Sequence, residues 1–267
     1  MKIIKKIMVL TFSTFIFFSC GKDSKEEPII TPPTSDEVNI NEPNTEVKND
    51  NENINPTPVP KPKLPKVMEV VSTTEKKQTE YSDYVINIPQ IINLDTEDIE
   101  YFNLTMKENM RNIIDNMATS KEDGEYESAD MNYQVKNNNF NVMSIILTTN
   151  LYPNGGAHPI HEIDAYNLNK KTGTLITNDK LLEDDDVDYF NMLINDQISN
   201  KKPIYNTNGE ECFLFNDIEA NVKDAIIYFE GDNIVFVFKE YYMAPYSSGM
   251  PMFKFNKDNI KKNIHLN

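Results

Sequence analysis

Apolar residues recur at helical spacing in one long stretch of the chain, residues 99–117. Positions three and four apart share one side of a helix, so this stretch predicts a helix whose apolar stripe faces a core. A second helix is predicted at 187–198. The acidic run Glu183–Asp186 stands just before it, and we interpret that run as a solvated first turn that the helix dipole favours.

Shorter segments combine alternation with apolar and β-branched residues, which predicts strands. The segment Tyr84–Ile88 is the first of them, and Pro89 is expected to end it. Asparagines 137–139 and the residues Glu230–Asp232 supply tight turns, the second of which marks the clearest hairpin. The other strands are predicted at 125–135, 140–149, 160–168, 174–177, 224–230 and 233–242.

The order of these elements predicts the fold class. A short closing helix is expected at 256–264. Few strand pairs are separated by helices, so the alternation of strand and helix that builds a parallel sheet is missing. We therefore expect an α+β fold, with a largely antiparallel sheet, two main helices and a short C-terminal helix.

The N-terminus has a different pattern, which is that of an export signal. Three lysines precede the apolar run Ile7–Phe18, which is too short for a membrane span, so residues 1–19 predict a secretory signal peptide. The residues Phe17–Cys20 resemble a bacterial lipobox. That resemblance implies cleavage before Cys20 and attachment of diacylglycerol to its sulfur, with this lipid as the membrane anchor. The alternative is an ordinary cleaved signal in which Cys20 has no role.

Residues 20–66 have the composition of a tether. They hold nine of the fifteen prolines, with Asn, Thr, Glu and Lys between them, and no repeating apolar pattern. Such a segment buries too little apolar surface to offset its ordering entropy. We expect it to hold a folded domain, residues 67–267, away from a lipid surface. The expected location is the cell envelope, facing the periplasm or the exterior.

The charge balance narrows the range of partners. The chain carries 26 basic and 42 acidic residues, a net charge of −16. Residues 1–66 contain nine of each kind, which leaves 17 basic and 33 acidic residues, again −16, in the predicted domain. Arg111 is the single arginine, so nucleic acid is a poor partner. A cationic partner would be attracted, although excess acid can also serve solubility alone.

Two of the three histidines lie in one unusual stretch, beside the adjacent glycines Gly155 and Gly156. His158 and His161 could suggest zinc. In a strand, however, residues i and i+3 point to opposite faces, and a zinc site needs three or four ligands. We therefore expect no metal and no cofactor. The glycines are interpreted as a turn, with His158 bonded to neighbouring backbone and with contact to a partner as a second role.

No residue pattern argues for catalysis. A Gly-x-Ser-x-Gly motif is absent from the sequence, and Cys212 opens the apolar run Cys212–Phe215, which is typical of a buried thiol. If Cys20 is acylated, Cys212 is the only thiol left and no disulfide forms within the chain. We expect neither enzyme activity nor a catalytic residue.

The stretch Glu240–Gly249 is rich in tyrosine. Tyr242 and Tyr246 are candidates for contact with a partner, because aromatic residues are enriched at interface hot spots. The alternative is that part of these side chains complete the core where the preceding strand leaves the sheet. Gly249 is expected to fix a turn, and Tyr246 is the residue of this stretch that is most expected to be exposed.

Two of these segments together resemble a known domain. The segment Leu151–His158 and the segment Glu240–Gly249 resemble the envelope domain of RsiV, a lysozyme-sensing anti-sigma factor. The opening part, from Tyr84, resembles the companion domain that precedes it. The resemblance implies two regions, a companion region at 67–150 and an RsiV-like domain at 151–267.

This sequence also departs from the family. Pro159 follows Gly-Gly-Ala-His at a position where the family commonly has Gly. The sigma-binding segment and transmembrane helix of RsiV have no counterpart in this sequence, nor has the polysaccharide deacetylase domain that follows this region in other relatives. The resemblance therefore implies the fold and, as a partner, a cationic protein such as lysozyme.

Three functions of different classes stay open from the sequence. The first is a lipid-anchored module of the cell envelope that captures a cationic, lysozyme-like protein. The second is a non-catalytic accessory domain that binds glycan, such as peptidoglycan, and the third is an enzyme that acts on peptidoglycan. A continuous acidic face would favour the first, a groove lined with tyrosine the second, and a cleft with converging polar groups the third. The candidate partner-binding residues are Gly155, Gly156, His158, Tyr242, Tyr246 and Gly249.

Replacing Cys20 with alanine tests the lipid anchor. The lipid would be carried by the Cys20 sulfur, so Cys20→Ala is expected to abolish incorporation of radiolabelled palmitate in growing cells. Cys212→Ala is the matched control and should keep the label. Labelling that persists in Cys20→Ala would end the lipoprotein interpretation.

Overall fold

The computed structural model describes residues 67–260, which lie within one compact unit of the chain, Lys66–Asn267. The predicted signal peptide, the tether and Cys20 lie outside the described residues, as does the end of the predicted closing helix. None of the described helices is long and apolar enough to cross a membrane.

Six strands form the first sheet, in the same order in space as in sequence. All neighbours are antiparallel except β2 and β3, which run parallel over a short register because helix α1 crosses between them. The bounds are β1 Glu69–Gln78, β2 Asp83–Ile92, α1 Glu97–Asp115, β3 Tyr126–Lys136, β4 Val142–Pro153, β5 Ile160–Asn169 and β6 Leu175–Ile176.

Four strands form the second sheet, in the order β7-β10-β9-β8. All its pairs are antiparallel. The bounds of this half are α2 Asn178–Leu181, α3 Asp184–Ser199, β7 Tyr205–Asn206, β8 Ile226–Glu230, β9 Asn233–Val237 and β10 Pro251–Asn256, with 3-10 turns at Val222–Asp224, Tyr246–Ser248 and Lys257–Asn259. The observed fold is α+β with mostly antiparallel sheets, as the sequence predicts.

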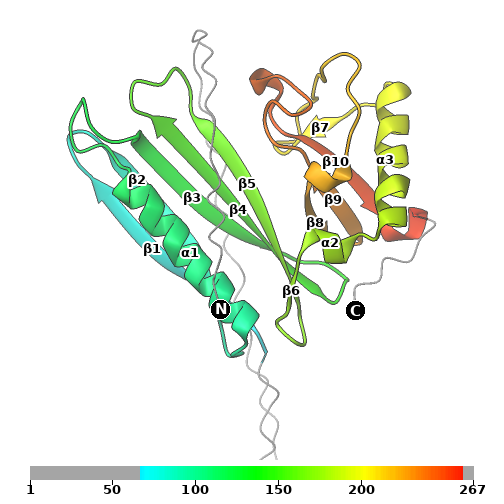
Figure 1. Cartoon of the computed structure of the whole chain (residues 1–267), viewed down its shortest axis with the longest axis horizontal. Coiled ribbons are helices and arrows are strands. Elements are labelled where there is room, and N and C mark those ends of the chain that lie inside the picture. Colours follow the sequence, from blue (N-terminus) through cyan, green and yellow to red (C-terminus); the bar gives the residue numbers. More distant parts are fainter. Residues whose placement is uncertain (1–66, 261–267) are drawn as a thin grey trace, which may run out of the picture. The chain divides into compact units, whose positions relative to one another are not determined.

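The elements stack in layers, with α1 on one side, the two sheets between and α3 on the other side (Figure 1). Phe102 and Met106 of α1 are fully buried against one face of the first sheet. Ile146 and Ile163, on the opposite face, pack against the second sheet. Phe190 of α3 is buried against the far face of the second sheet. Each sheet therefore has apolar contacts on both faces.

Helix α3 begins as the sequence predicts, with one difference. Glu183 is the N-cap, and its backbone N–H donates to the Asp186 carboxylate at 3.1 Å, which completes a capping box. The acidic run is therefore the first turn of the helix. Asp186 is buried, however, so this part of the run is structural and not solvated.

The two sheets are joined by a buried polar bridge. The Ser144 hydroxyl donates to Asn167 Oδ1 at 2.7 Å and accepts the backbone N–H of Phe229 at 3.0 Å. Asn167 Nδ2 donates to the Ile227 carbonyl at 2.7 Å. Both side chains are at most 2% exposed. They thus satisfy the backbone of β8, the edge strand of the second sheet, from β4 and β5 of the first.

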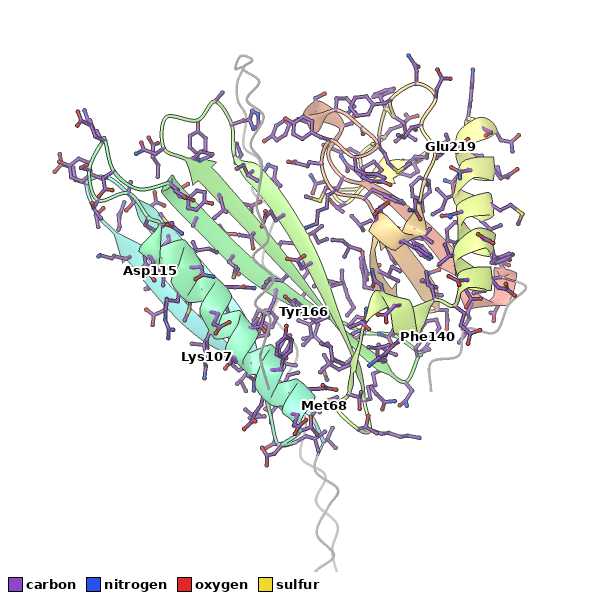
Figure 2. The ribbon with its side chains drawn as sticks, viewed as in Figure 1. Met68, Lys107, Asp115, Phe140, Tyr166 and Glu219 are labelled. Carbon is purple, nitrogen blue, oxygen red and sulfur yellow. The ribbon has the colours of Figure 1, made fainter. Side chains whose placement is uncertain are left out.

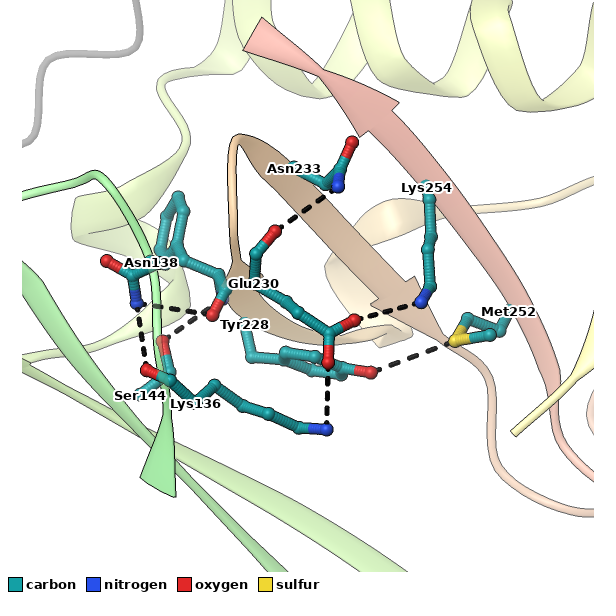
Figure 3. Close-up of polar contacts among 9 residues, drawn as sticks. Lys136, Asn138, Ser144, Tyr228, Glu230, Asn233, Met252 and Lys254 are labelled. Atoms are coloured by element: carbon teal, nitrogen blue, oxygen red, sulfur yellow. Dashed lines mark hydrogen bonds and ion pairs between the residues drawn. The ribbon is translucent and has the colours of Figure 1, made fainter. Parts of the chain in front are cut away.

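A second set of contacts continues this bridge toward solvent (Figure 3). Glu230 of β8 pairs with Lys254 at 2.9 Å and with Lys136 of the first sheet at 3.0 Å. These two hydrogen bonds hold the pKa of the Glu230 carboxyl below its usual value, and the one from Lys254 has the larger effect. Tyr228 lies beside them, and burial raises the pKa of its hydroxyl to about 12.

Most element boundaries differ from the prediction by a few residues, and three of the differences are informative. Strand β2 continues through Pro89. Strand β3 pairs only with Asp83–Ile86, so β2 has a single neighbouring strand, β1, at Pro89. Because no strand lies on the other side there, the N–H that proline lacks is not required. The strand expected at 233–242 ends at Val237. The closing helix is wrong in its described part, where Asn256 ends β10 and only a 3-10 turn follows.

The domain division inferred from the resemblance stays a prediction. Strand β4 runs from Val142 to Pro153 and so crosses the expected boundary between residues 150 and 151. In the described residues, both proposed regions contribute strands to the first sheet.

Removing the amide of Asn167 should weaken the packing of the two sheets and lower the free energy of unfolding. Asn167→Ala leaves the Ile227 carbonyl without its donor, so we expect a loss of about 1–3 kcal/mol in the free energy of unfolding. Asn137→Ala, at an exposed position of the adjacent turn, should change it by less than about 0.5 kcal/mol. Urea unfolding followed by circular dichroism measures both; equal values for the two variants would contradict the role of the bridge.

Candidate functional site

A cleft of about 560 Å³ opens between the first sheet and the loops of the second. One wall is a face of β3, β4 and β5. The other wall comes from the loop after β7 and the loop between β9 and β10. Its lining includes Gln134, Thr148, Asn150, His161, Asn208, Glu210, Tyr228, Glu240, Tyr246, Ser247 and Gly249.

The sheet face that lines this cleft changes from apolar to polar along its strands. Ile146 and Ile163 are buried where the second sheet covers the face. Two and four residues further along β4 the same face carries Thr148 and Asn150, and His161 lies opposite Asn150 on β5. Polar side chains therefore begin where the cover of the second sheet ends.

His161 is the central hydrogen-bonding group of the cleft. Its Nδ1 lies 2.6 Å from Asn150 Oδ1, and its Nε2 lies 3.2 Å from the Tyr246 hydroxyl. A neutral ring fits both contacts, with Nδ1–H donating and Nε2 accepting from tyrosine. Burial lowers the pKa of His161, and the nearby His158 lowers it further. The arrangement therefore favours the neutral imidazole.

Aromatic rings connect the two loops that the sequence analysis singled out. The rings of His158 and Tyr246 are 4.1 Å apart between centroids, and those of Tyr246 and Tyr241 are 6.1 Å apart. The expectation that His158 and His161 point to opposite faces is wrong, because His158 precedes β5 and both rings lie against Tyr246. The expected backbone bond of His158 is present, from Nδ1 to the Pro159 carbonyl at 2.9 Å.

Glu240 is the carboxyl group most perturbed at this site. Burial raises its pKa to about 7, although a hydrogen bond from the His161 backbone N–H and the charge of His158 favour the ionised form. The His161 backbone can make this hydrogen bond because β6 pairs only with Asn167 and Leu168, at the other end of β5. At neutral pH the carboxyl can therefore donate as well as accept hydrogen bonds.

The double glycine forms the expected turn. Gly156 N–H donates to the Pro153 carbonyl at 2.8 Å, and Gly155 has φ +69°, in the left-handed region. The backbone N–H of Gly155 also donates to Glu127 at 3.2 Å. These contacts account for the turn, and Gly155 and Gly156 are not among the residues that line the cleft.

Gly249 and Asn206 shape the opposite wall. Gly249 has φ +68°, and a Cβ there would lie 3.1 Å from Asn206 Nδ2. The buried Asn206 amide bonds Ser248 through its nitrogen and the loop residues Asn208 and Glu210 through its oxygen. The glycine therefore allows the close approach that holds this loop.

The loop from Glu240 to Gly249 divides between core and surface, as the alternative interpretation expects. Met243 is fully buried. Tyr246 is half-buried while Tyr241 and Tyr242 are exposed, so the expectation that Tyr246 is the exposed residue of this loop is wrong. Tyr242 is exposed, stacks on Phe238 and donates from its hydroxyl to Asp224 at 2.8 Å. It is not brought together with His158.

Exposed aromatic side chains occur in strand β7 and in the two adjoining loops that follow β7 and β9. The backbone N–H of Phe215 donates to the Met243 carbonyl at 2.8 Å, so the loop after β7 runs beside the loop after β9. We name these side chains the aromatic surface: Phe213 (71% exposed), Tyr241 (56%), Tyr205 (49%), Phe215 (43%) and Tyr242 (36%).

The arrangement of the described His, Cys, Asp and Glu side chains bears on metal binding, and the burial of Cys212 bears on thiol reactivity. Among residues 67–260, no group of three or more His, Cys, Asp or Glu side chains could hold a metal ion. Cys212 is buried, as expected, and burial raises the pKa of its thiol. Its neighbours Phe213 and Phe215, in contrast, are exposed, so the apolar run is not a core strand.

Sequence reasoning missed Asn150, Glu240 and the two exposed phenylalanines as site residues. Asn150 could have been found from its place in β4, where a polar residue interrupts an apolar strand. Glu240 carries no local signal, because its burial depends on contacts with β5, far away in sequence. Phe213 and Phe215 lie in an apolar run, and because such runs are usually buried, nothing in the sequence indicates their exposure.

The fold and the cleft define a mixed α+β domain with two packed sheets and a polar site between them. Residues 75–161 match the family model described as Deacetylase PdaC. This part of the chain is therefore similar to that family, and it contains His158 and His161 but not Glu240 or Tyr246. The name of that family does not by itself establish catalysis here.

Two solved structures resemble this chain, both from the DUF3298 family. The protein from Pseudomonas aeruginosa PAO1 is 14% identical, with a TM-score of 0.45, and the one from Bacteroides fragilis NCTC 9343 is 15% identical, with a TM-score of 0.46. Each match covers 72% of this chain and 91% of the other. No curated protein matches the chain.

The raised pKa of Glu240 predicts a pH-dependent stability. An unfolded glutamate has a pKa of about 4.3, so between that value and about 7 the folded state binds the proton more tightly. The free energy of unfolding should therefore rise as pH falls through this window. Glu240→Gln removes the ionisation, so its Tm should exceed that of the wild type at pH 8 and approach it at pH 5.

Thermal unfolding at both pH values measures this difference. Glu75→Gln, at an exposed position of β1, is the control and should change Tm by the same small amount at pH 8 and pH 5. A Glu240→Gln variant whose Tm differs from the wild type equally at both pH values would show that the carboxyl does not titrate in this window.

Proposed function

We propose that this protein is a lipid-anchored binding module of the cell envelope that captures a cationic protein on its aromatic surface. The observation that carries this proposal is a group of five exposed aromatic side chains in a strongly acidic part of the chain. Large exposed aromatics are uncommon on soluble surfaces unless they serve contact, and they are enriched at interface hot spots.

The charge around the aromatic surface supports a basic partner. Residues 205–249 contain eight acidic residues and only two lysines. Both lysines are paired, Lys223 with Asp184 at 3.2 Å and Lys239 with Asp164 at 3.7 Å. Glu219 lies toward the same end of the second half as these loops (Figure 2). A basic protein would be steered to this end and would gain contacts between its cations and the aromatic rings.

The sequence-derived residues take different roles in this proposal. Tyr242 stays a direct contact, because it is exposed. Tyr246 and His158 support the surface from behind, since Tyr246 stacks between His158 and the exposed Tyr241. Gly249 sets the course of the loop through its positive φ. The anchor and the envelope location are supported by the N-terminal sequence alone.

Single substitutions in the aromatic surface should slow capture very little and speed release. With a c-type lysozyme as the probe, Phe213→Ala and Tyr241→Ala should each raise the dissociation rate about 5- to 30-fold, since loss of a docked aromatic costs about 1–2 kcal/mol. Tyr101→Ala, on α1 at 62% exposure, is the matched control and should change neither rate. Surface plasmon resonance measures both rates.

The acidic residues should govern the association rate. The double variant Asp217→Asn, Glu219→Gln removes two of the eight acidic residues, so association at 50 mM salt should slow while dissociation stays nearly constant. Raising the salt to 300 mM should slow association in the wild type as well. Absence of saturable lysozyme binding at low salt would refute this partner class, and an equal loss in Tyr101→Ala would refute the surface.

A further inference from the structure

Strand β1 is an edge of the first sheet, and among the described residues β2 is its single neighbouring strand (Figure 1). In an antiparallel pair, every second residue directs its backbone N–H and C=O toward the neighbouring strand, and the residues between direct theirs away. Thr79 continues the register of this pair and donates to the Ser82 carbonyl at 2.8 Å. The odd-numbered residues of β1 therefore bond β2, and the even-numbered residues face the open edge.

The other end of β1 gives the same assignment. Val70 lies opposite Ile91 in the register. The N–H and C=O of Ile91 are both bonded to the Asn103 side chain of α1, at 2.8 and 2.9 Å, so Ile91 has no backbone group for Val70. Within residues 67–260, no backbone group bonds the outward side of the even-numbered residues, which are Val70, Ser72, Thr74, Lys76 and Gln78.

This edge lacks most of the features that keep edge strands from pairing with other chains. Such strands are usually short or bulged, or they contain proline. Strand β1 is ten residues long, pairs with β2 without a break in register and contains no proline. The segment Val70–Thr74 consists of β-branched residues and one serine, which suit extended backbone. The strand is therefore a template for an added strand.

Charge indicates which chain can pair with this edge. Residues 67–267 carry a net charge of −16, so two copies of the domain repel each other over most of their surface. Strand β1 itself has two glutamates and two lysines, Glu69, Glu75, Lys76 and Lys77, and so has no net charge. A cavity of about 250 Å³ between β1 and α1 adds Lys107 and Arg111 beside it. At this edge two copies can meet without the repulsion that acts elsewhere.

We propose that β1 pairs with β1 of a second copy of this chain, antiparallel and around a two-fold axis at Thr73, so that the two first sheets join. In this register Glu69 of each copy lies opposite Lys77 of the other, and Ser72 lies opposite Thr74. Opposite charges and hydroxyl side chains are favourable cross-strand pairs. The outward backbone groups of both strands bond each other.

Other registers use the charges less well. An axis at Ser72 would place Glu69 opposite Glu75 of the other copy, and like charges in that position are destabilising. An axis at Thr74 would place Lys77 opposite a valine and would lose both ion pairs. A parallel pairing in register would place each charge opposite its own kind. The pattern of charges along β1 therefore selects the axis at Thr73.

This pairing stands without the proposal for a cationic protein. The residues of β1 do not line the cleft, and β1 belongs to a different sheet from the strands that carry the aromatic surface. A dimer joined at β1 leaves both of those places open.

Oxidative cross-linking of the full chain in intact cells tests the pairing, with Cys212→Ala as the parent. Thr73→Cys places a thiol on the proposed axis, where the two Cα atoms would be about 4.5 Å apart, within the range of a disulfide. Copper phenanthroline should therefore produce a covalent dimer on a non-reducing gel, above the yield of the parent. Lys77→Cys, on the same face of β1, is the matched control. Its two copies would be about 26 Å apart, so its yield should be at least about ten-fold lower.

Ser72→Pro, combined with Thr73→Cys, tests the backbone bonds. The Ser72 N–H faces the open edge, so proline leaves the bonds between β1 and β2 intact and removes one bond of the proposed pair. The yield should fall about five-fold or more, as expected for one lost hydrogen bond, while the Tm stays near that of the parent. If Ser72→Pro does not fold, the charges give the same test. Lys77→Glu should lower the yield, and addition of Glu69→Lys should restore it.

Several results would overturn the pairing. These are no Thr73→Cys dimer above the parent yield, equal yields from Thr73→Cys and Lys77→Cys, and an unchanged yield in a folded Ser72→Pro variant. Failure of Glu69→Lys to restore the yield of Lys77→Glu would refute the register. A Thr73→Cys product that contains a different protein would assign the edge to that protein in place of a second copy.

Discussion

The buried bridge of Ser144 and Asn167 determines how the two halves of this domain meet. Strand β8 is an edge strand, and its backbone groups would be costly if they were buried without partners. The bridge supplies a donor to the Ile227 carbonyl and an acceptor to the Phe229 N–H, from two different strands of the first sheet. Both contacts must form together, so they fix the register of one sheet on the other. The position of the cleft, which opens beyond the covered part of the sheet face, follows from that register.

The same constraint explains why polar residues are tolerated on the inner face of β4. Under the second sheet this face is apolar, at Ile146, and beyond it the face carries Thr148 and Asn150. Residues two apart in a strand point to the same face, so Ile146, Thr148 and Asn150 share a face and differ in whether the second sheet covers them. Burial of Glu240 belongs to the same boundary, because its loop closes over the open edge of β5 and reaches the His161 backbone. The unusual pKa of this carboxyl is therefore a result of sheet packing.

Much of the fold could be predicted from the sequence where local pattern and tertiary contact agree. The helix at 99–117 has one apolar stripe, and the hairpin around Glu230–Asp232 has strong strands on both sides. Strand β1 was missed because its residues are mostly polar and exposed, and only its pairing with β2 makes it a strand. Strand β10 was missed because Met250 and Met252 follow a tyrosine-rich loop and suggested a continuous recognition segment.

The candidate site was less predictable, since it is made by contacts between distant residues. His161 and Tyr246 are 85 positions apart in the sequence and share a hydrogen bond. Both loops are conspicuous in the sequence, because glycine, histidine and tyrosine are unusual in such density, but no sequence pattern places their rings side by side. Phe213 is a different case, because it directly follows the buried Cys212 in an apolar run and is nevertheless exposed.

The loop after β9 contributes residues to both the cleft and the aromatic surface. The packing of this loop fixes how the two places lie with respect to each other. Met243 and Ala244 are fully buried, so the middle of this loop is fixed in the core. Glu240 and Tyr246, on either side of that anchor, face the cleft, while Tyr241 and Tyr242 are exposed. The cleft and the aromatic surface thus use different side chains of one anchored segment. The Tyr246 ring connects the cleft to the aromatic surface, because it bonds His161 in the cleft and stacks against Tyr241.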